Sequence, residues 1–391
     1  MPFHVPNPFP EQYTKLHRGN MLVSKRLVAS YVLDWIVIIC FVAVGGALSF
    51  VKAHPRPFSL LDLTIAYPLV SESISVTTLG LVALLAPAII ILLTTAFLLP
   101  ARSIRRTLNR SQLIRMKLWE LHVGLAGLAM AVAVSFFVTQ GLKTIFAKPR
   151  PHFLALCDPD LQTVGASIVG GYGQDISARW TLVDTSICSH PAKAGLEDGF
   201  RSFPSGHCSF SWSGMLYLAL FLCAKLAIAL PYLPLIPKSA GQTPPPPPRD
   251  TEMLPLHDTR GRQHSSQSKS PDPPAPREPP TQTWDIYNQA AAPPVYGLLM
   301  VLIPLGVATY ISSTRYTEYW HFGFDVISGS VIGIVSAWVA FRWYHLPIRR
   351  GQGWAWGPRS VSRAFGTGIG TGGYVETAAP VDARSVASGR E

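Results

Sequence analysis

Six long apolar segments separated by polar loops make up most of the chain. A helix of about 20 apolar residues is long enough to cross a hydrocarbon core about 30 Å thick. The fifth segment is the shortest, and the sixth carries Asp325 at its start. The pattern predicts an all-α protein, a bundle of six transmembrane helices, near residues 27–51, 76–99, 118–142, 209–230, 295–311 and 324–343.

The composition agrees with a membrane protein. Of the 391 residues, 48% are hydrophobic and only 14% are charged, whereas about a quarter of the residues of a soluble domain are charged. The net charge of +11 raises the question of nucleic-acid binding. The basic residues lie beside apolar runs and not in a stripe interleaved with aromatics, so we predict no nucleic-acid partner.

The polar segments divide the chain further. Residues 1–26 show no short apolar core with a cleavage site, so we expect the first span to be the membrane anchor and not a removable signal. A Pro-rich insert and a tail rich in Gly, Ser and Arg cannot bury a core, and both are predicted to be disordered. The predicted divisions are a cytosolic N-terminal segment 1–26, membrane domain 27–231, cytosolic insert 232–294, membrane domain 295–345 and cytosolic tail 346–391.

The insert contains an uninterrupted proline run, Pro244–Pro248. Such a run adopts polyproline geometry, which SH3-like domains bind. An SH3-like partner is therefore one interpretation, and a tolerated insertion without a partner is the simpler one.

Lys and Arg predict the orientation in the membrane. The N-terminus and the loop 100–117 hold ten basic residues in 44 positions. The segments 52–75, 143–208 and 312–323 hold nine in 102 positions. Because the side richer in Lys and Arg is cytosolic, we expect both termini in the cytosol and these three segments on the opposite face.

Two stretches within the segment 143–208 carry groups suited to binding phosphate. Lys143 follows the third span, and Arg150 comes seven residues later between two prolines that stiffen the chain. Arg offers a planar fork that binds phosphate oxygens in pairs. In Pro-Ser-Gly-His, Ser205 and Gly206 offer backbone N–H groups at a helix start, with the His207 imidazole beside them. Each motif alone has an ordinary structural reading, as a span flank or a helix cap.

A third stretch with groups of this kind contains Arg315, His321 and Asp325. On a helix, His321 and Asp325 would share a face, so a hydrogen bond between them is expected to fix the tautomer and free the other nitrogen as a nucleophile. Glu318 is an alternative partner. An Asp at the edge of a span is costly unless it is paired, which favours a functional role.

Five cysteines are too few for a disulfide scaffold. Cys157 and Cys188 fall in the same loop on the oxidising side, which makes them a candidate disulfide. Cys40 and Cys223 lie within spans and are expected to be free, and Cys208 stays unassigned.

Three motifs in this order resemble the type 2 phosphatidic acid phosphatase superfamily: Lys-x6-Arg-Pro (143–151), Pro-Ser-Gly-His (204–207) and Arg-x5-His-x3-Asp (315–325). Segments 148–157 and 202–210 are similar to its membrane lipid phosphate phosphatases, including the fungal diacylglycerol pyrophosphate phosphatases. Two departures concern specificity more than catalysis. Thr314 stands where the family usually has Ser, and Trp320 and Phe322 flank His321 where lipid phosphatases carry a cation and a second His.

The resemblance implies a role for each matching residue. His321 would be the nucleophile that forms a phosphohistidine, with Asp325 orienting it, and His207 would protonate the leaving oxygen and then activate water. No metal or other cofactor is needed, because cations and N–H groups would stabilise the transferring phosphoryl group. The phosphate-binding residues would be Lys143, Arg150, Ser205, Gly206 and Arg315.

The predicted function is hydrolysis of diacylglycerol pyrophosphate, phosphatidate or lysophosphatidate on the lumenal or extracellular face of a vacuolar, ER/Golgi or plasma membrane. The enzyme alternatives are a phosphatase for sphingoid-base or polyprenyl phosphates and a lipid phosphotransferase. The alternative of another class is a catalytically silent membrane scaffold, which the complete set of catalytic positions disfavours.

Overall fold

The computed structural model describes residues 24–100, 105–106, 108–177, 180–189, 195–228, 294–348, 353–359, 361 and 364–365. Apart from Pro294, the predicted insert 232–294 lies outside these residues, and so does the proline run that an SH3-like partner could bind. Six helical segments in the described part are long and apolar enough to cross a membrane, which confirms the predicted bundle. They are α2 (Lys25–Phe50), Val76–Leu98, α6 (Arg110–Phe146), α9 (Gly206–Lys225), α11 (Val295–Thr317) and α12 (Gly323–Tyr344).

Helix ends differ from the predicted spans where polar residues continue a helix. The fifth span is not the shortest, because α11 continues past its apolar run to Thr317 and has 23 residues. The shortest is α9, with 20 residues. Hydropathy finds only the apolar part of a helix, and the polar turns beyond it carry Lys143 in α6 and Arg315 in α11.

The second span is irregular. It consists of α3 (Val76–Gly80), a π-helical turn η2 (Leu81–Leu85), α4 (Ala86–Leu93) and a second π-helical turn η3 (Thr94–Leu98). Pro87 has no N–H, so the Ala83 carbonyl one turn earlier has no α-helical donor. Gly214 of α9 lies directly against that carbonyl, since a Cβ there would be 1.8 Å from the Ala83 oxygen.

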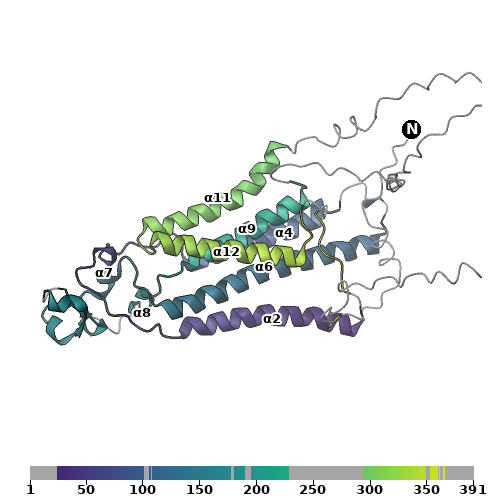
Figure 1. Ribbon diagram of the computed structural model, residues 1–391. Coiled ribbons are helices and arrows are strands. Elements are labelled where there is room, and N and C mark those ends of the chain that lie inside the picture. Colours follow the sequence, from purple (N-terminus) through teal and green to yellow (C-terminus); the bar gives the residue numbers. More distant parts are fainter. Residues whose placement is uncertain are drawn as a thin grey trace, which may run out of the picture. The chain divides into compact units, whose positions relative to one another are not determined.

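Helix α9 is the centre of the bundle. It packs against α6, α11 and α12, whereas α2 packs on α6 (Figure 1). Its buried Ser209, Ser211 and Ser213 lower its hydropathy, and a helix enclosed by other helices tolerates these small polar residues. The lipid-facing α2 instead exposes large apolar side chains along most of its length.

Two glycines bring α12 onto α9. A Cβ at Gly329 would lie 2.5 Å from the Ser205 oxygen, and one at Gly333 would lie 2.5 Å from the Ser209 oxygen. The pair is a Gly-x-x-x-Gly repeat, which lets two helix backbones approach closely in a membrane. This contact sets the distance between the start of α12 and the start of α9.

We expect Gly329→Ala to destabilise the protein by about 1–3 kcal/mol, because the added methyl forces α12 away from α9. The rate of phosphate release should fall by more than the loss of folded protein explains, because the shift separates Ser205 from Asp325. The measurement is the melting temperature and the rate of phosphate release in detergent. Gly306→Ala in α11 is the matched control, because no atom lies within 4 Å of the added Cβ. Equal behaviour of the two variants would contradict the proposed role of Gly329.

A small extramembrane layer covers one end of the bundle. It holds α7 (Phe153–Cys157), α8 (Leu196–Gly199), and strand β1 (Ile168–Gly170) paired antiparallel with β2 (Leu182–Val183). This two-stranded sheet is a minor exception to the all-α prediction. The remaining elements are short 3-10 turns at Leu63–Ile65, Val164–Ala166, Tyr172–Asp175 and Thr185–Ile187.

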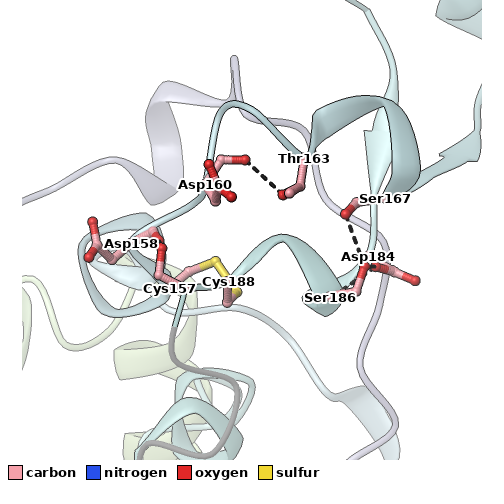
Figure 2. The surroundings of a disulfide bond; sticks show 9 residues. Cys157, Asp158, Asp160, Thr163, Ser167, Asp184, Ser186 and Cys188 are labelled. Atoms are coloured by element: carbon pink, nitrogen blue, oxygen red, sulfur yellow. Dashed lines mark hydrogen bonds between the residues drawn. A yellow bond between two sulfur atoms is a disulfide. The ribbon is translucent and has the colours of Figure 1, made fainter.

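The Cys157–Cys188 disulfide closes this layer, as the candidate pairing predicted (Figure 2). The two cysteines are 31 residues apart in the sequence, and they lie in an apolar cluster with Phe58, Phe153 and Phe200. Cys40, Cys208 and Cys223 are free. The disulfide therefore links two segments of a layer that also has an apolar cluster of its own.

At the opposite end of the bundle, part of the segment predicted as a disordered tail has a defined structure. Lys225 pairs with the buried Glu120 and donates to the Gly353 carbonyl at 2.7 Å, and Ala355 N donates to Glu120 Oε1 at 3.2 Å. Arg359 pairs with Asp34 of α2 at 2.9 Å. The tail composition predicted disorder because these partners lie far away in the sequence.

Candidate active site

Four helix ends meet beneath the extramembrane layer. They are the C-terminal ends of α6 and α11 and the N-terminal ends of α9 and α12. A Cβ on Gly206 would lie 3.5 Å from Lys143 Nζ, and Ser205 N donates to the Asp325 carbonyl at 3.0 Å. The three predicted stretches thus converge on one place, as the six-span topology requires.

Arg150 is buried and held from two sides. Its Nη2 and Nε atoms donate to the Asp198 carboxylate at 2.6 Å and to the Asp198 carbonyl at 2.9 Å. Its guanidinium carbon lies 4.8 Å from the Trp320 ring centre. Trp320, which replaces a cation common in lipid phosphatases, therefore fixes the position of a cation.

The electrostatics of Asp198 follow from these neighbours. Burial alone would raise the pKa of Asp198, but the positive charges of Arg150, Lys143 and Arg201 hold it below its ordinary value. Asp198 is thus ionised and pairs with Arg150 at neutral pH.

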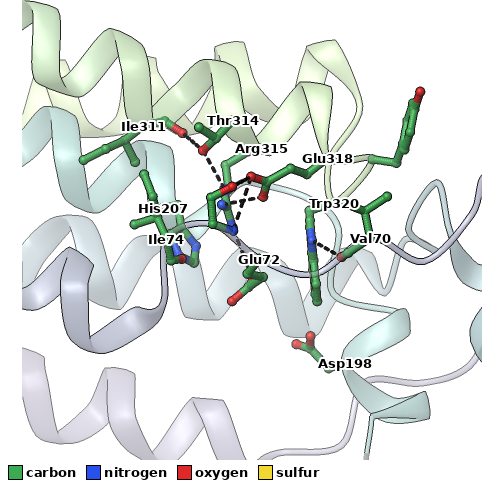
Figure 3. Close-up of polar contacts among 12 residues, drawn as sticks. Val70, Glu72, Ile74, Asp198, His207, Ile311, Thr314, Arg315, Glu318 and Trp320 are labelled. Carbon is green, nitrogen blue, oxygen red and sulfur yellow. Dashed lines mark hydrogen bonds and ion pairs between the residues drawn. The ribbon is translucent and has the colours of Figure 1, made fainter.

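Arg315 is fully buried, and all three of its nitrogens have partners. Nη2 donates to Glu318 at 2.8 Å, Nη1 to Glu72 at 3.2 Å and Nε to the Thr314 hydroxyl at 3.2 Å (Figure 3). The hydroxyl retained in Thr314 therefore orients Arg315. Glu318 is not the partner of His321, because its carboxylate binds Arg315 and Ser73.

Lys143 differs from the two arginines. Within the described part of the chain, no carboxylate lies within ion-pair distance of its ammonium. It adjoins Gly206 at the start of α9, where helix amides point outward. A cation without a counter-ion beside free amides is an arrangement that binds anions.

The start of α9 supplies those amides, with one change from the prediction. The Ser205 N–H is not available, because it donates to the Asp325 carbonyl. Among the described residues, the N–H groups of Gly206, His207 and Cys208 have no backbone acceptor, as expected for the first turn of a helix. Ser205 is the N-cap by position, but its fully buried hydroxyl makes no capping bond and has no other hydrogen-bond partner in this part of the chain.

His321 is almost completely buried, and its Nδ1 lies 2.6 Å from the Ser202 carbonyl. A carbonyl can only accept, so Nδ1 carries the proton and the lone pair is on Nε2. Burial, with the positive charges of Arg150 and Lys143, holds the pKa of His321 well below its ordinary value. The ring is therefore neutral at pH 7 and has one nitrogen available as a nucleophile.

The expected hydrogen bond between His321 and Asp325 is not formed. His321 precedes the N-cap Phe322 of α12, so the two residues are not on one helix face. Asp325 Oδ2 accepts from Ser202 Oγ at 2.5 Å, and Oδ1 pairs with Lys148 at 2.8 Å. Asp325 thus reaches His321 through Ser202, whose hydroxyl binds Asp325 and whose carbonyl binds His321.

His207, at the start of α9, belongs to the same site. Its Nε2 lies 3.0 Å from the Ile74 carbonyl (Figure 3). By the same argument, the proton of the neutral ring is on Nε2. The segment that carries Ile74 was not among the predicted site stretches.

Sequence reasoning therefore missed several members of the site. Ser202 and Lys148 are the first residues of the segments 202–210 and 148–157, so their position next to the predicted site residues was an available signal. Asp198 and Glu72 are ordinary loop or helix-end carboxylates, and only the folded structure brings them to the cations. Glu318 was considered, but as a partner of His321 and not of Arg315. Across the described residues, no group of three or more His, Cys, Asp or Glu is arranged to hold a metal ion.

Comparison with known proteins identifies the family. Residues 124–349 match the family model of the PAP2 superfamily. The chain belongs to this superfamily. It is an integral membrane hydrolase of the phosphatidate phosphatase type, and all the predicted site residues fall within the matched region.

Its relatives carry related names. A probable diacylglycerol pyrophosphate phosphatase 1 of Schizosaccharomyces pombe is 26% identical over 75% of this chain and 73% of its own length. Lipid phosphate phosphatase 2 of Arabidopsis thaliana is 23% identical over 82% and 79%. Diacylglycerol pyrophosphate phosphatase 1 of Saccharomyces cerevisiae is 27% identical over 52% and 61%. No solved structure matches the chain.

Proposed function

We propose that this protein hydrolyses diacylglycerol pyrophosphate, phosphatidate and lysophosphatidate through a phosphohistidine at His321, without a metal ion. The observation that carries the proposal is the neutral His321 ring with its Nε2 lone pair free, beside Lys143, Arg150 and Arg315. A neutral nucleophile is not repelled by an anionic phosphate, and the cations stabilise the charge on the phosphoryl oxygens in the transition state.

In the first step, His321 Nε2 forms a bond to phosphorus while the bond from phosphorus to the leaving oxygen breaks. With the substrate bound, His207 carries a second proton on Nδ1 and gives it to that oxygen, and the diacylglycerol, monoacylglycerol or phosphatidate product leaves. Lys143, Arg150, Arg315 and the amides of Gly206 and His207 hold the three phosphoryl oxygens.

In the second step, His207 removes a proton from water, and the water oxygen attacks phosphorus. The bond from phosphorus to Nε2 breaks, which releases inorganic phosphate and restores neutral His321. The Ser202 carbonyl keeps Nδ1 protonated throughout, and the charge of Asp325 stabilises the positive phosphoimidazole through Ser202.

An apolar groove between α6 and α12 supports a lipid substrate. It is lined by Met130, Val134 and Val138 on α6 and by Val331, Val335 and Val339 on α12. Val138 lies five residues before Lys143, about 8 Å along the helix. An acyl chain in this groove would place its phosphate at the site while the tail stays in the bilayer.

We further propose that the site faces the lumen or the exterior and that both termini are cytosolic. The distribution of Lys and Arg supports this orientation. The Cys157–Cys188 disulfide supports it as well, since disulfides persist in oxidising compartments.

The test is phosphate release by the purified full chain in detergent with excess EDTA. The substrates are diacylglycerol pyrophosphate, phosphatidate, lysophosphatidate and a sphingoid-base phosphate. We expect phosphate release to continue in EDTA. We also expect the three glycerolipids to be hydrolysed faster than the sphingoid-base phosphate. A faster sphingoid-base phosphate would overturn the substrate class, and inhibition by EDTA would overturn the metal-free scheme. No release from any substrate would leave a transferase or a silent scaffold.

A further inference from the structure

A segment outside the matched family region lies across the site. Residues 67–75 precede the second span, and each of the three site stretches contacts them. Tyr67 N donates to the Pro151 carbonyl at 3.0 Å, and its ring stacks on Tyr319 with centres 4.7 Å apart. Trp320 Nε1 donates to the Val70 carbonyl at 3.2 Å.

The second half of the segment reaches the chemical groups themselves. Glu72 pairs with Arg315 at 3.2 Å, Ser73 N donates to Glu318 at 3.3 Å, and the Ile74 carbonyl binds His207 at 3.0 Å (Figure 3). The nearest of these partners, His207, is 133 residues away in the sequence. The segment is therefore part of the site by contact, although no motif marks it.

The two carboxylates on Arg315 are not equivalent. Glu318 is buried, and its carboxylate accepts hydrogen bonds from the amide and the hydroxyl of Ser73 as well as from Arg315. The side chain of Glu72 is 28% exposed, and its one hydrogen bond among the described residues is to Arg315. The three bonds use three of the five N–H donors of the guanidinium. Of the two carboxylates on Arg315, Glu72 is the one held less firmly, so it is the partner that an arriving phosphate can displace most readily.

We infer that residues 67–75 are a fourth stretch of the active site and that the Glu72 carboxylate holds, on Arg315, the place that a phosphoryl oxygen takes when phosphate binds. Glu72 is then a positioning residue: it keeps the buried guanidinium paired until phosphate binds, and it competes with the phosphate for the guanidinium. The inference rests on the proposed role of Arg315 in binding phosphate.

The competition depends on the charge of Glu72. Partial burial raises the pKa of Glu72, against the lowering effect of Arg315 and Arg150. The other charged groups facing it are Glu318 and Asp198, which raise its pKa further, and Lys143. As pH falls, Glu72 becomes neutral and its pair with Arg315 weakens, so its competition with phosphate is strongest at high pH.

The experiment compares the wild-type chain with Glu72→Gln, using inorganic phosphate as the probe. We expect the inhibition constant for phosphate to fall about tenfold in the variant at high pH, because a neighbouring negative charge is gone. The ratio between the two proteins should shrink toward one as pH falls. Comparing two proteins at each pH cancels the ionisation of phosphate itself.

Glu197→Gln is the control, because this exposed carboxylate pairs with Lys52 and contacts none of the site cations. It should leave the inhibition constant unchanged. Weaker or unchanged phosphate binding in Glu72→Gln, or an equal gain in Glu197→Gln, would overturn the inference.

Stabilisation of the protein by phosphate is measured as well, since a shift in melting temperature requires no turnover. A larger shift in Glu72→Gln than in the wild type supports the inference even if the lipids are not hydrolysed, an outcome that would count against the proposed function alone. Equal shifts in an enzyme that hydrolyses the lipids would overturn the inference and leave the proposed function standing.

Discussion

Replacing His321 by alanine is expected to abolish phosphate release, with a loss of at least about 10⁴-fold in kcat, the scale seen when a covalent nucleophile is removed. We do not expect His207 to replace it, because His207 Nε2 donates to the Ile74 carbonyl and the other ring nitrogen handles the proton of the leaving group. The variant should still bind phosphate, since Lys143, Arg150 and Arg315 are unchanged. The measurement is single-turnover phosphate release together with trapping of the labelled phosphoenzyme.

His54→Ala is the control for this variant, since His54 is an exposed residue of the loop before the second span. Its turnover and labelling should equal those of the wild type. A labelled phosphoenzyme in His321→Ala, or a loss of less than about tenfold, would show that another residue is the nucleophile.

The arrangement of the bundle could be predicted because hydropathy and charge act locally. Each span is long enough to identify itself, and counting spans alone brings Lys143, Ser205 and Arg315 to one end. The motifs then identify which polar residues at that end carry chemistry. For these reasons the sequence predicts that the three stretches meet at one end of the bundle, and in the structure they do.

Partner choice could not be predicted in the same way. The spacing of His321 and Asp325 predicts a contact only on a continuous helix, and α12 begins two residues after His321. Glu72 and Arg315 are 243 residues apart in the sequence, and no periodic pattern in the sequence predicts a contact over such a separation. The loop carboxylates that hold the site arginines therefore appear only when the chain is folded.

The changed role of Asp325 leads to the second large effect. Asp325→Asn is expected to lower kcat by roughly 10³-fold, on the scale of removing the charge behind a catalytic histidine. The phosphoimidazole on His321 is positive, and without the Asp325 charge only Lys148, another cation, remains beside Ser202. KM should change little, because Asp325 contacts none of the phosphate-binding side chains in the described structure.

A double-mutant cycle distinguishes transmission through Ser202 from a direct contact. If Asp325 acts through the Ser202 hydroxyl, adding Ser202→Ala to Asp325→Asn should cost almost nothing further, because the link is already broken. Lys148→Met is the matched variant on the other carboxylate oxygen, and it should lower kcat by less than about tenfold, since the link through Ser202 stays intact. Fully additive effects of Asp325→Asn and Ser202→Ala on kcat would contradict this link. They would show that Asp325 stabilises His321 directly during turnover, without Ser202 as the link.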